Sequence, residues 1–265
     1  MKKHFAILAV LISSVLCGCN VDVVVDPGTP VDKEFLIAGG YDALDVSNSF
    51  DVFVDENATA VTVTAGENIM SRVIVEQVGG ELKIYCKPQV LSVNGGYLKA
   101  IIPHSPALKN ITVSGASGVD TPYPVVGNNV NIKVSGASRF VGDISADKVD
   151  MDISGASRIT GNVTADDMKM ELSGASVADI KGIADNLKMS LSGASHNKEN
   201  VVLQHYGLEC TSCKGSISGA SKAYIHCLED IDVSLSGASS LHYTGDATAD
   251  DCSTSGASSV VHDRL

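Results

Sequence analysis

The sequence predicts an all-β protein whose larger part is a parallel β-helix, a solenoid with about 19 residues per coil. Three observations carry this prediction. The tetrapeptide Ser-Gly-Ala-Ser recurs eight times in 265 residues. The residues that precede the copies alternate between apolar and polar side chains. The chain is 44% hydrophobic but only 5% aromatic and has no Trp, so we expect a core of small aliphatic side chains.

The repeat determines the architecture. Its copies follow one another at intervals of 21, 19, 19, 19, 26, 18 and 19 residues, and such a near-constant period indicates a solenoid or another repeat array. Nineteen residues leave too little chain for a helix with two loops. They fit one coil of about 60 Å contour with three short sides, stacked on the next coil at about 4.8 Å. The copies begin at Ser114, Ser135, Ser154, Ser173, Ser192, Ser218, Ser236 and Ser255.

The alternation before each copy predicts a strand with one buried face. Val130, Ile132 and Val134 alternate with Asn131 and Lys133, and later repeats follow the same pattern. A period of two is typical of a β-strand and excludes a helix at these positions. The apolar side chains are therefore expected to form ladders inside the solenoid.

The tetrapeptide itself is predicted to be a structural turn. Its Gly follows the strand, where a bend requires a positive φ or no side chain. We expect its Ala to continue inward and its serine hydroxyls to lie above one another and bond the backbone or each other. A catalytic serine is the alternative, but eight equivalent copies argue against a nucleophile, which needs one site with an adjacent base.

A second recurrence, Ala-Asp, falls near the end of several coils. Asp commonly caps its own turn through backbone N–H groups, which is the simpler interpretation. A calcium ladder is the alternative, because stacked carboxylates repel one another. The sequence lacks the glycine-rich nonapeptide of calcium β-rolls, so no metal site is predicted. The copies are Ala146-Asp147, Ala165-Asp166, Ala184-Asp185 and Ala249-Asp250.

One coil is longer than the others. Positions 196–217 carry the extra residues, among them His205, Tyr206 and Cys210-Thr-Ser-Cys213. An insertion in a solenoid forms a loop on one face. This is where we expect a contact specific to a single coil.

The N-terminus has the features of an export signal. Lys2 and Lys3 precede an apolar stretch about half as long as a transmembrane helix. Leu16-Cys17-Gly18-Cys19 then resembles the lipobox of bacterial lipoproteins. This resemblance implies that residues 1–18 are removed as a signal peptide and that Cys19 carries lipid. An ordinary secretory signal with two incidental cysteines is the alternative.

Residues 19–34 are predicted to be a tether, because Pro27-Gly28-Thr29-Pro30 keeps this segment extended. Several acyl chains on Cys19 would anchor the protein stably in a membrane. We therefore expect an outer-membrane lipoprotein that faces the cell surface or the periplasm. Cleavage before Cys19 removes two lysines and no acid, which changes the net charge from −12 to −14.

Residues 35–107 lack the tetrapeptide but still alternate. Strands are predicted at 50–54, 60–64, 72–76, 81–85 and 98–102, and Gly79-Gly80 is typical of a hairpin turn. We interpret 35–107 as an atypical N-terminal β section that covers the end of the solenoid, and 108–265 as the solenoid itself.

The arrangement resembles a known family. Residues 41–52, Gly79-Gly80-Glu81-Leu82-Lys83-Ile84 and 108–117 are similar to the opening and middle of the putative auto-transporter adhesin, head GIN domain family of Bacteroidetes envelope lipoproteins. The resemblance covers about residues 38–262. It implies a right-handed β-helix, a location in the cell envelope and an adhesive role, without catalytic residues. The C-terminal membrane barrel of an auto-transporter is not evident here.

The cysteines are expected to be core residues. Cys213 takes the place that Ile231 has one coil later, and Cys252 the place of Val233, so both should face inward as small hydrophobes. Buried thiols are the first interpretation, one disulfide the second, and a zinc site that includes Cys227 and His226 the third. Beyond Cys17 and Cys19, the chain contains Cys86, Cys210, Cys213, Cys227 and Cys252.

These observations favour a non-enzymatic envelope lipoprotein that acts as an adhesin-like binding or structural module. No cofactor is expected, and the acidic balance argues against nucleic acid as a partner. The expected partners are the membrane, which the lipid would enter, a glycan or protein ligand, and further copies of the same chain through self-association. The alternatives are a polysaccharide-active β-helix enzyme and a purely architectural spacer.

Overall fold

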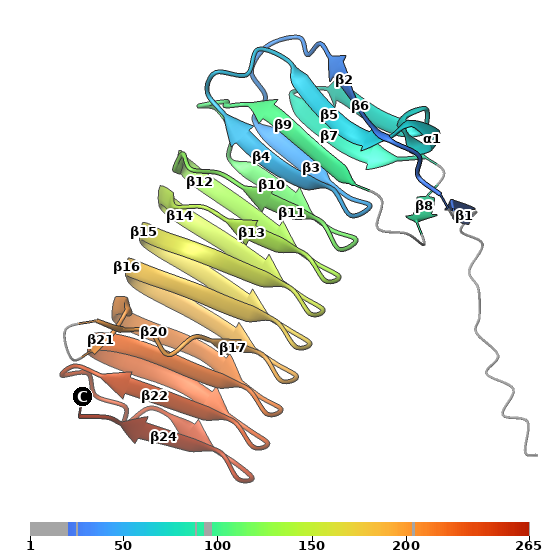
Figure 1. The fold of residues 1–265 in the computed structure, drawn as a ribbon. Coiled ribbons are helices and arrows are strands. Elements are labelled where there is room, and N and C mark those ends of the chain that lie inside the picture. The colour runs from blue at the N-terminus through green and yellow to red at the C-terminus, as the bar shows by residue number, and fades with distance from the viewer. Residues whose placement is uncertain (1–20, 25, 88, 93–96, 203–204, 265) are drawn as a thin grey trace, which may run out of the picture.

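The computed structural model describes residues 21–24, 26–87, 89–92, 97–202 and 205–264. A stack of coils extends from a small cap of mixed β-structure near the N-terminus to the C-terminal end of the chain (Figure 1). A sheet of 20 strands runs through both parts, and α1 (Glu67–Met70) is the only helix among the described residues. The predicted all-β solenoid is therefore confirmed.

The coils pair in parallel and in register. Ile132, Met151, Met170 and Met189 occupy the same position in four successive coils. A coil of 19 residues that returns to the same register places every residue above its counterpart, as the period predicted. The strands of this part are β12 (Val125–Val134), β13 (Arg139–Val141), β14 (Ile144–Ile153), β15 (Arg158–Leu172), β16 (Val177–Leu191), β17 (His196–Asn197), β20 (Leu208–Ile217), β21 (Lys222–Leu235), β22 (Ser240–Thr244), β23 (Ser253–Thr254) and β24 (Ser259–His262).

The core is a continuous column of inward side chains. In β15, Ile159, Val163, Ala165, Met168, Met170 and Leu172 are buried while the intervening residues face outward. Each fully buried Ile, Leu or Met contributes about 1.5–3 kcal/mol to folding. Aliphatic and Met side chains dominate this column, and Phe140 is an exception. The low aromatic content thus reflects a narrow interior.

The solenoid begins before the first tetrapeptide. β3 (Ala43–Val46) pairs in parallel with β10 (Asn110–Val113) on one side and with β7 (Glu81–Cys86) on the other. β4 (Asp51–Asp55) likewise lies between β11 (Gly118–Asp120) and β9 (Leu98–Pro103). Residues 43–55 therefore form a coil that is inserted out of chain order. The predicted boundary at residue 108 does not coincide with the start of the coils.

The cap consists of antiparallel strands on the end of the solenoid. β5 (Val61–Gly66) pairs with β9, and β6 (Val73–Val78) pairs with β7 through the predicted Gly79-Gly80 hairpin. Both glycines have positive φ, at 60° and 87°. This change of strand direction ends the parallel stack.

The tether predicted for residues 19–34 differs from the structure. β2 (Pro30–Phe35) forms an antiparallel pair with β5 over six residues, and β1 (Val21–Val24) pairs with β8 (Gln89–Ser92). The three consecutive charged residues of β2, Asp32, Lys33 and Glu34, suit an exposed edge strand, and β5 offers it a pairing edge. No helix in the described residues is long and apolar enough to cross a membrane.

Candidate functional site

The predicted serine ladder lies at the turn after each strand. The backbone N–H of the first serine of the tetrapeptide donates to the coil before it, as Ser135 does to the Val113 carbonyl at 2.9 Å. The side chains of these serines are half-buried or exposed. The Ser218 and Ser255 hydroxyls donate to backbone carbonyls of the preceding coil at 3.4 Å. The ladder comprises Ser114, Ser135, Ser154, Ser173, Ser192, Ser218, Ser236 and Ser255.

The buried serine is the fourth residue of the tetrapeptide, not the first. Ser176 is buried and donates to the Ile153 carbonyl at 3.1 Å, and Ser195 donates to the Leu172 carbonyl at 3.2 Å. Ser195 also lies 3.3 Å from the Ser221 hydroxyl. These hydroxyls lie inside the turn and bond protein groups. The equivalent buried serines are Ser117, Ser138, Ser157, Ser176, Ser195, Ser221 and Ser239.

The expectation that the Ala points inward is wrong. Ala156 and its counterparts are exposed at the apex of the turn, because Ala156 stands three positions after the buried Ile153, whereas the buried Ser157 stands four positions after it, in phase with the inward side chains of the strand. Gly155 has a φ of 73°. A Cβ on Gly155 would lie 2.4 Å from the Gly136 carbonyl oxygen. The Gly is therefore required both by its φ and by the close approach of the next coil.

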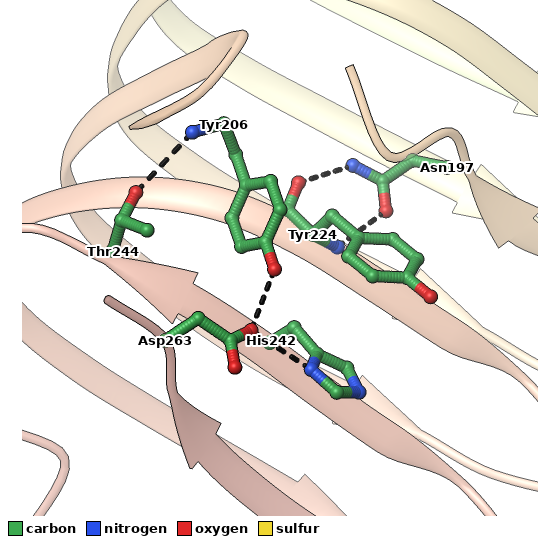
Figure 2. Close-up of polar contacts among 6 residues, drawn as sticks. All are labelled: Asn197, Tyr206, Tyr224, His242, Thr244 and Asp263. Atoms are coloured by element: carbon green, nitrogen blue, oxygen red, sulfur yellow. Dashed lines mark hydrogen bonds and ion pairs between the residues drawn. The ribbon is translucent and has the colours of Figure 1, made fainter. Parts of the chain in front are cut away.

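The insertion folds back over the last coils (Figure 2). Tyr206, in β19 (His205–Tyr206), donates its hydroxyl to the Asp263 carboxylate at 2.5 Å. Its backbone N–H donates to the Thr244 hydroxyl at 3.3 Å. His242 Nδ1 donates to the same Asp263 oxygen at 2.9 Å. Through Asp263, the longest coil is connected to the last described residues of the chain.

The same face carries stacked rings. Tyr206 contacts Tyr224 edge-on at 5.3 Å between ring centroids, and Tyr224 stacks on His242 at 5.1 Å. The Asn197 side chain bonds both backbone groups of Tyr224, at 2.6 and 2.7 Å (Figure 2). It replaces the strand pairing that the insertion interrupts. The sequence placed Tyr206 in this loop but gave no sign that Asp263, 57 residues later, would meet it.

The electrostatics keep this network formed at neutral pH. Burial opposes ionisation of the Asp263 carboxyl, but the hydrogen bonds from Tyr206 and His242 together hold its pKa below the usual 3.8. Burial, followed by the hydrogen bond to Asp263, raises the pKa of Tyr206. Tyr206 therefore remains a donor and Asp263 an acceptor. We call Tyr206, His242 and Asp263 the C-terminal latch.

The latch contains the Asp-His half of a nucleophilic triad. In the described part of the chain, no serine or cysteine hydrogen-bonds to the remaining ring nitrogen of His242. The carboxylate is shared with a tyrosine hydroxyl. This geometry suits a structural connection between coils.

Three cysteines meet in the core. Cys210 and Cys227 are register partners on adjacent coils, and Cys213 lies opposite Ile231 as predicted. All three are fully buried, whereas Cys252 is half-buried, and each of the five described cysteines is a free thiol in this structure. Burial raises the pKa of Cys86 to about 11. Within the described ranges, no three His, Cys, Asp or Glu side chains are arranged to hold a metal ion.

Three of the recurrent Asp residues lie within strands β14, β15 and β16, where two consecutive exposed residues interrupt the alternation. Asp147, Asp166 and Asp185 are exposed, each directly after an Ala in register with its counterparts. The predicted lipid-attachment residue, Cys19, lies outside the described residues.

Residues 40–247 match the model of a family described as “Putative auto-transporter adhesin, head GIN domain”. This match covers more than half of the chain. The chain belongs to the head GIN domain family. The match includes part of the cap, the coil inserted out of order and the insertion, but ends before Asp263. No curated protein matches the sequence.

Solved structures with the head GIN fold are similar over nearly the whole chain. A “putative adhesin” from Parabacteroides merdae has a TM-score of 0.79 and 18% identity, and covers 92% of this chain and 100% of its own. A “putative lipid binding protein” from Parabacteroides distasonis has a TM-score of 0.78 and 20% identity over the same shares. A “putative adhesin” from Bacteroides fragilis has a TM-score of 0.60 and 15% identity, over 89% and 97%. At these identities the likeness shows the fold.

Proposed function

We propose that this chain is a non-enzymatic, lipid-anchored protein of the cell envelope that binds its ligand along the outer surface of the solenoid. The observation that carries the proposal is the regular lateral surface of in-register parallel strands. The names of the family and of the similar solved structures, which refer to adhesion in most cases, support the same function.

The form of this surface suits binding rather than catalysis. Side chains that face outward repeat in columns along the stack, so that successive coils present equivalent positions to a ligand. Enzyme sites are usually concave pockets with a few convergent polar groups. The lateral surface instead has broad, shallow depressions, one of them of about 650 Å³. Such a surface suits an extended or polymeric ligand.

The position of β1, the first described strand, supports the anchored orientation. Val21, the first described residue, lies two positions after Cys19 in a strand beside the cap (Figure 1). A lipid on Cys19 would place the cap next to the membrane. The coils would then extend away from the bilayer, with their lateral surface accessible.

Protease treatment of intact cells, combined with a cell-binding assay, tests the proposal. We expect external protease to degrade the protein on intact cells, and the purified chain from residue 20 onward to bind cell-surface or matrix material. Protection until the outer membrane is broken would contradict a surface role. Turnover of a polysaccharide by the purified chain would favour the enzyme alternative.

A further inference from the structure

One lateral face of the solenoid is formed by the strand segments that directly precede the tetrapeptide turns. We call it the pre-turn face. Its segments belong to β12, β14, β15, β16, β20 and β21, which pair in parallel and in register. Outward side chains therefore stand in columns, with successive members about 4.8 Å apart.

The central column of this face contains three consecutive lysines. Lys169 pairs in register with Lys188, and Lys188 with Lys214. Asp150 stands before them and Asp232 after them. Like charges directly opposite one another on neighbouring strands are destabilising, so an anion bound between these lysines would stabilise the arrangement.

In the earlier coils, the protein itself supplies the anion. Lys148 forms an ion pair with Asp150 at 3.3 Å, and Lys169 pairs with Glu171 at 3.0 Å. Each lysine thus has an acid two positions away on the same face. Charge is balanced within the coil at these positions.

The acids are replaced by neutral side chains where Lys188 and Lys214 stand. In the next column, Glu171 is followed by Ser190 and Ser216. On the other side, Asp167 is followed by Asn186 and Ser212. Among the described residues, Lys188 and Lys214 consequently have no ion pair. On its own strand, Lys188 stands between Asn186 and Ser190, and Lys214 stands between Ser212 and Ser216, while Asp232 is the register partner of Lys214 on the next coil.

These neutral neighbours are held in place by contacts with one another. Ser212 donates to the Asn186 amide oxygen at 3.2 Å, and the Ser190 and Ser216 hydroxyls lie 3.4 Å apart. The Asn186 amide donates to Asp167 at 3.0 Å. The surroundings of the two lysines are thus ordered before any ligand arrives, which lowers the entropic cost of binding.

A shallow depression of about 650 Å³ lies over this site. Four lysines and two aspartates line it, giving a local charge of +2 in a chain whose net charge is −12. A second depression on the same face is lined by serines of the following coils, including Ser216 and Ser234. The face therefore continues along the solenoid axis from charged to hydroxyl-bearing side chains.

We propose that the pre-turn face binds an acidic oligosaccharide, with Lys188 and Lys214 each holding a carboxylate or sulfate of the sugar chain. This inference rests on the proposed binding function and specifies its ligand class. Asn186, Ser190, Ser212 and Ser216 provide the hydrogen-bonding groups that sugar hydroxyls require. Successive coils, stacked along the axis, match a ligand with repeating acidic groups.

The lining does not favour the other common polyanions. Single-stranded nucleic acid is held by aromatic side chains on which bases stack, and no aromatic residue lines this depression. Duplex DNA needs an extended basic surface, whereas two aspartates stand among the four lysines of this depression. A lipid surface is bound through exposed apolar side chains, whereas the apolar members here, Met168 and Leu187, are buried.

Binding of defined glycans to the purified chain from residue 20 onward tests this inference. The probes are polygalacturonate oligomers and chondroitin sulfate, with neutral dextran and a DNA duplex for comparison. We expect the acidic glycans to bind, neutral dextran not to bind, and the affinity to fall with rising salt concentration. Lys188→Gln with Lys214→Gln should weaken acidic-glycan binding by at least about tenfold.

The matched control changes two other exposed lysines. Lys181→Gln with Lys222→Gln removes the same charge from other faces, and we expect affinity within about twofold of the parent chain. Circular dichroism should show both double variants folded. An equal loss of glycan affinity in both double variants would show that net charge alone governs binding, and would overturn the site. Unchanged affinity in the Lys188/Lys214 variant would overturn it too, as would binding of the DNA duplex as tight as that of the acidic glycans. If the chain binds cells but no acidic glycan, this inference fails while the proposed function stands.

Discussion

Phe50 occupies, in the coil inserted out of chain order, the position that Ser117 occupies in the coil stacked on it. Gly118 pairs in register with Asp51, and its N–H donates to the Phe50 carbonyl at 2.8 Å. In the next coil, Arg139 donates to the Ser117 carbonyl in the same way, at 2.9 Å. On this side Ser117 thus has an aromatic residue as its counterpart instead of another serine. The Ser117 hydroxyl is buried and has no partner among the described residues.

This difference predicts opposite results for two identical substitutions. Ser117→Ala removes an unsatisfied hydroxyl and should leave the stability unchanged or raise it by up to about 1 kcal/mol. Ser195→Ala removes a hydroxyl that donates to the Leu172 carbonyl, and should lower the stability by about 1 kcal/mol. Urea unfolding measures both. Equal destabilisation by the two would contradict the assignment of Ser117 as unsatisfied.

Gly155 should not tolerate a side chain. Gly155→Ala is opposed by the φ of 73° and by the Gly136 carbonyl oxygen, which would lie 2.4 Å from the new Cβ, and should cost about 1–3 kcal/mol. Gly127→Ala is the control, because a Cβ there would meet nothing closer than 3.8 Å. The melting temperature should fall for Gly155→Ala and remain unchanged for Gly127→Ala. A comparable fall in both would mean that the turn adapts to the added methyl group.

The C-terminal latch should open in acid. The pKa of Asp263 is lowered in the folded protein, so its ionisation adds stability at pH values above 3.8. That stability is lost as the pH falls through the lowered pKa. Protection factors from hydrogen exchange, which correct for the slower intrinsic exchange in acid, should fall first in residues 205–207 and 259–264 as the solution is acidified.

Tyr206→Phe provides the matched variant for the latch. It removes the donor to Asp263 but keeps the ring, and should speed exchange in the same residues by about tenfold at neutral pH. Tyr85→Phe removes a hydroxyl bonded to an exposed acid in the cap, and should leave these residues unaffected. Unchanged exchange in the Tyr206 variant would show that the ring packing alone holds the insertion.

The cysteines should differ in their reactivity toward iodoacetamide. Hydrogen bonds among the thiols, followed by burial, raise the pKa of Cys210 and Cys227, and both side chains are inaccessible to solvent. Cys252 is half-buried and should be modified first in the native protein. Mass spectrometry of digested protein measures the order, with unfolded protein as the control. Rapid native modification of Cys210 would be inconsistent with this core.

Lipid attachment is tested by metabolic labelling with a fatty acid. Cys19→Ser should abolish the label, and an inhibitor of signal peptidase II should leave residues 1–18 attached to the parent chain, which a shift in electrophoretic mobility reports. Cys17→Ser is the control and should retain the label, because Cys17 belongs to the part that is removed. Persistent labelling of the Cys19 variant would point to another site.

Much of the solenoid could be predicted because its determinants are local. The interval of 19 residues sets the length of a coil, and the alternation around Ile132 sets which side chains face inward. The hairpin at Gly79-Gly80 follows from local backbone preference in the same way. The expectation of an inward Ala was wrong because it did not follow the alternation through the turn: Ala156 stands an odd number of positions after the buried Ile153 and faces outward, and Ser157 faces inward.

By itself, the sequence determined the coil, its period and its turn, since each depends on residues a few positions apart. Only the tertiary structure decided which coil lies beside which. Residues 43–55 enter the stack out of order, Tyr206 meets Asp263, and Lys188 and Lys214 form one column with Lys169. These contacts join residues far apart in the chain. They are selected by the edges and faces that remain open once the coils have stacked, and no local pattern encodes that choice.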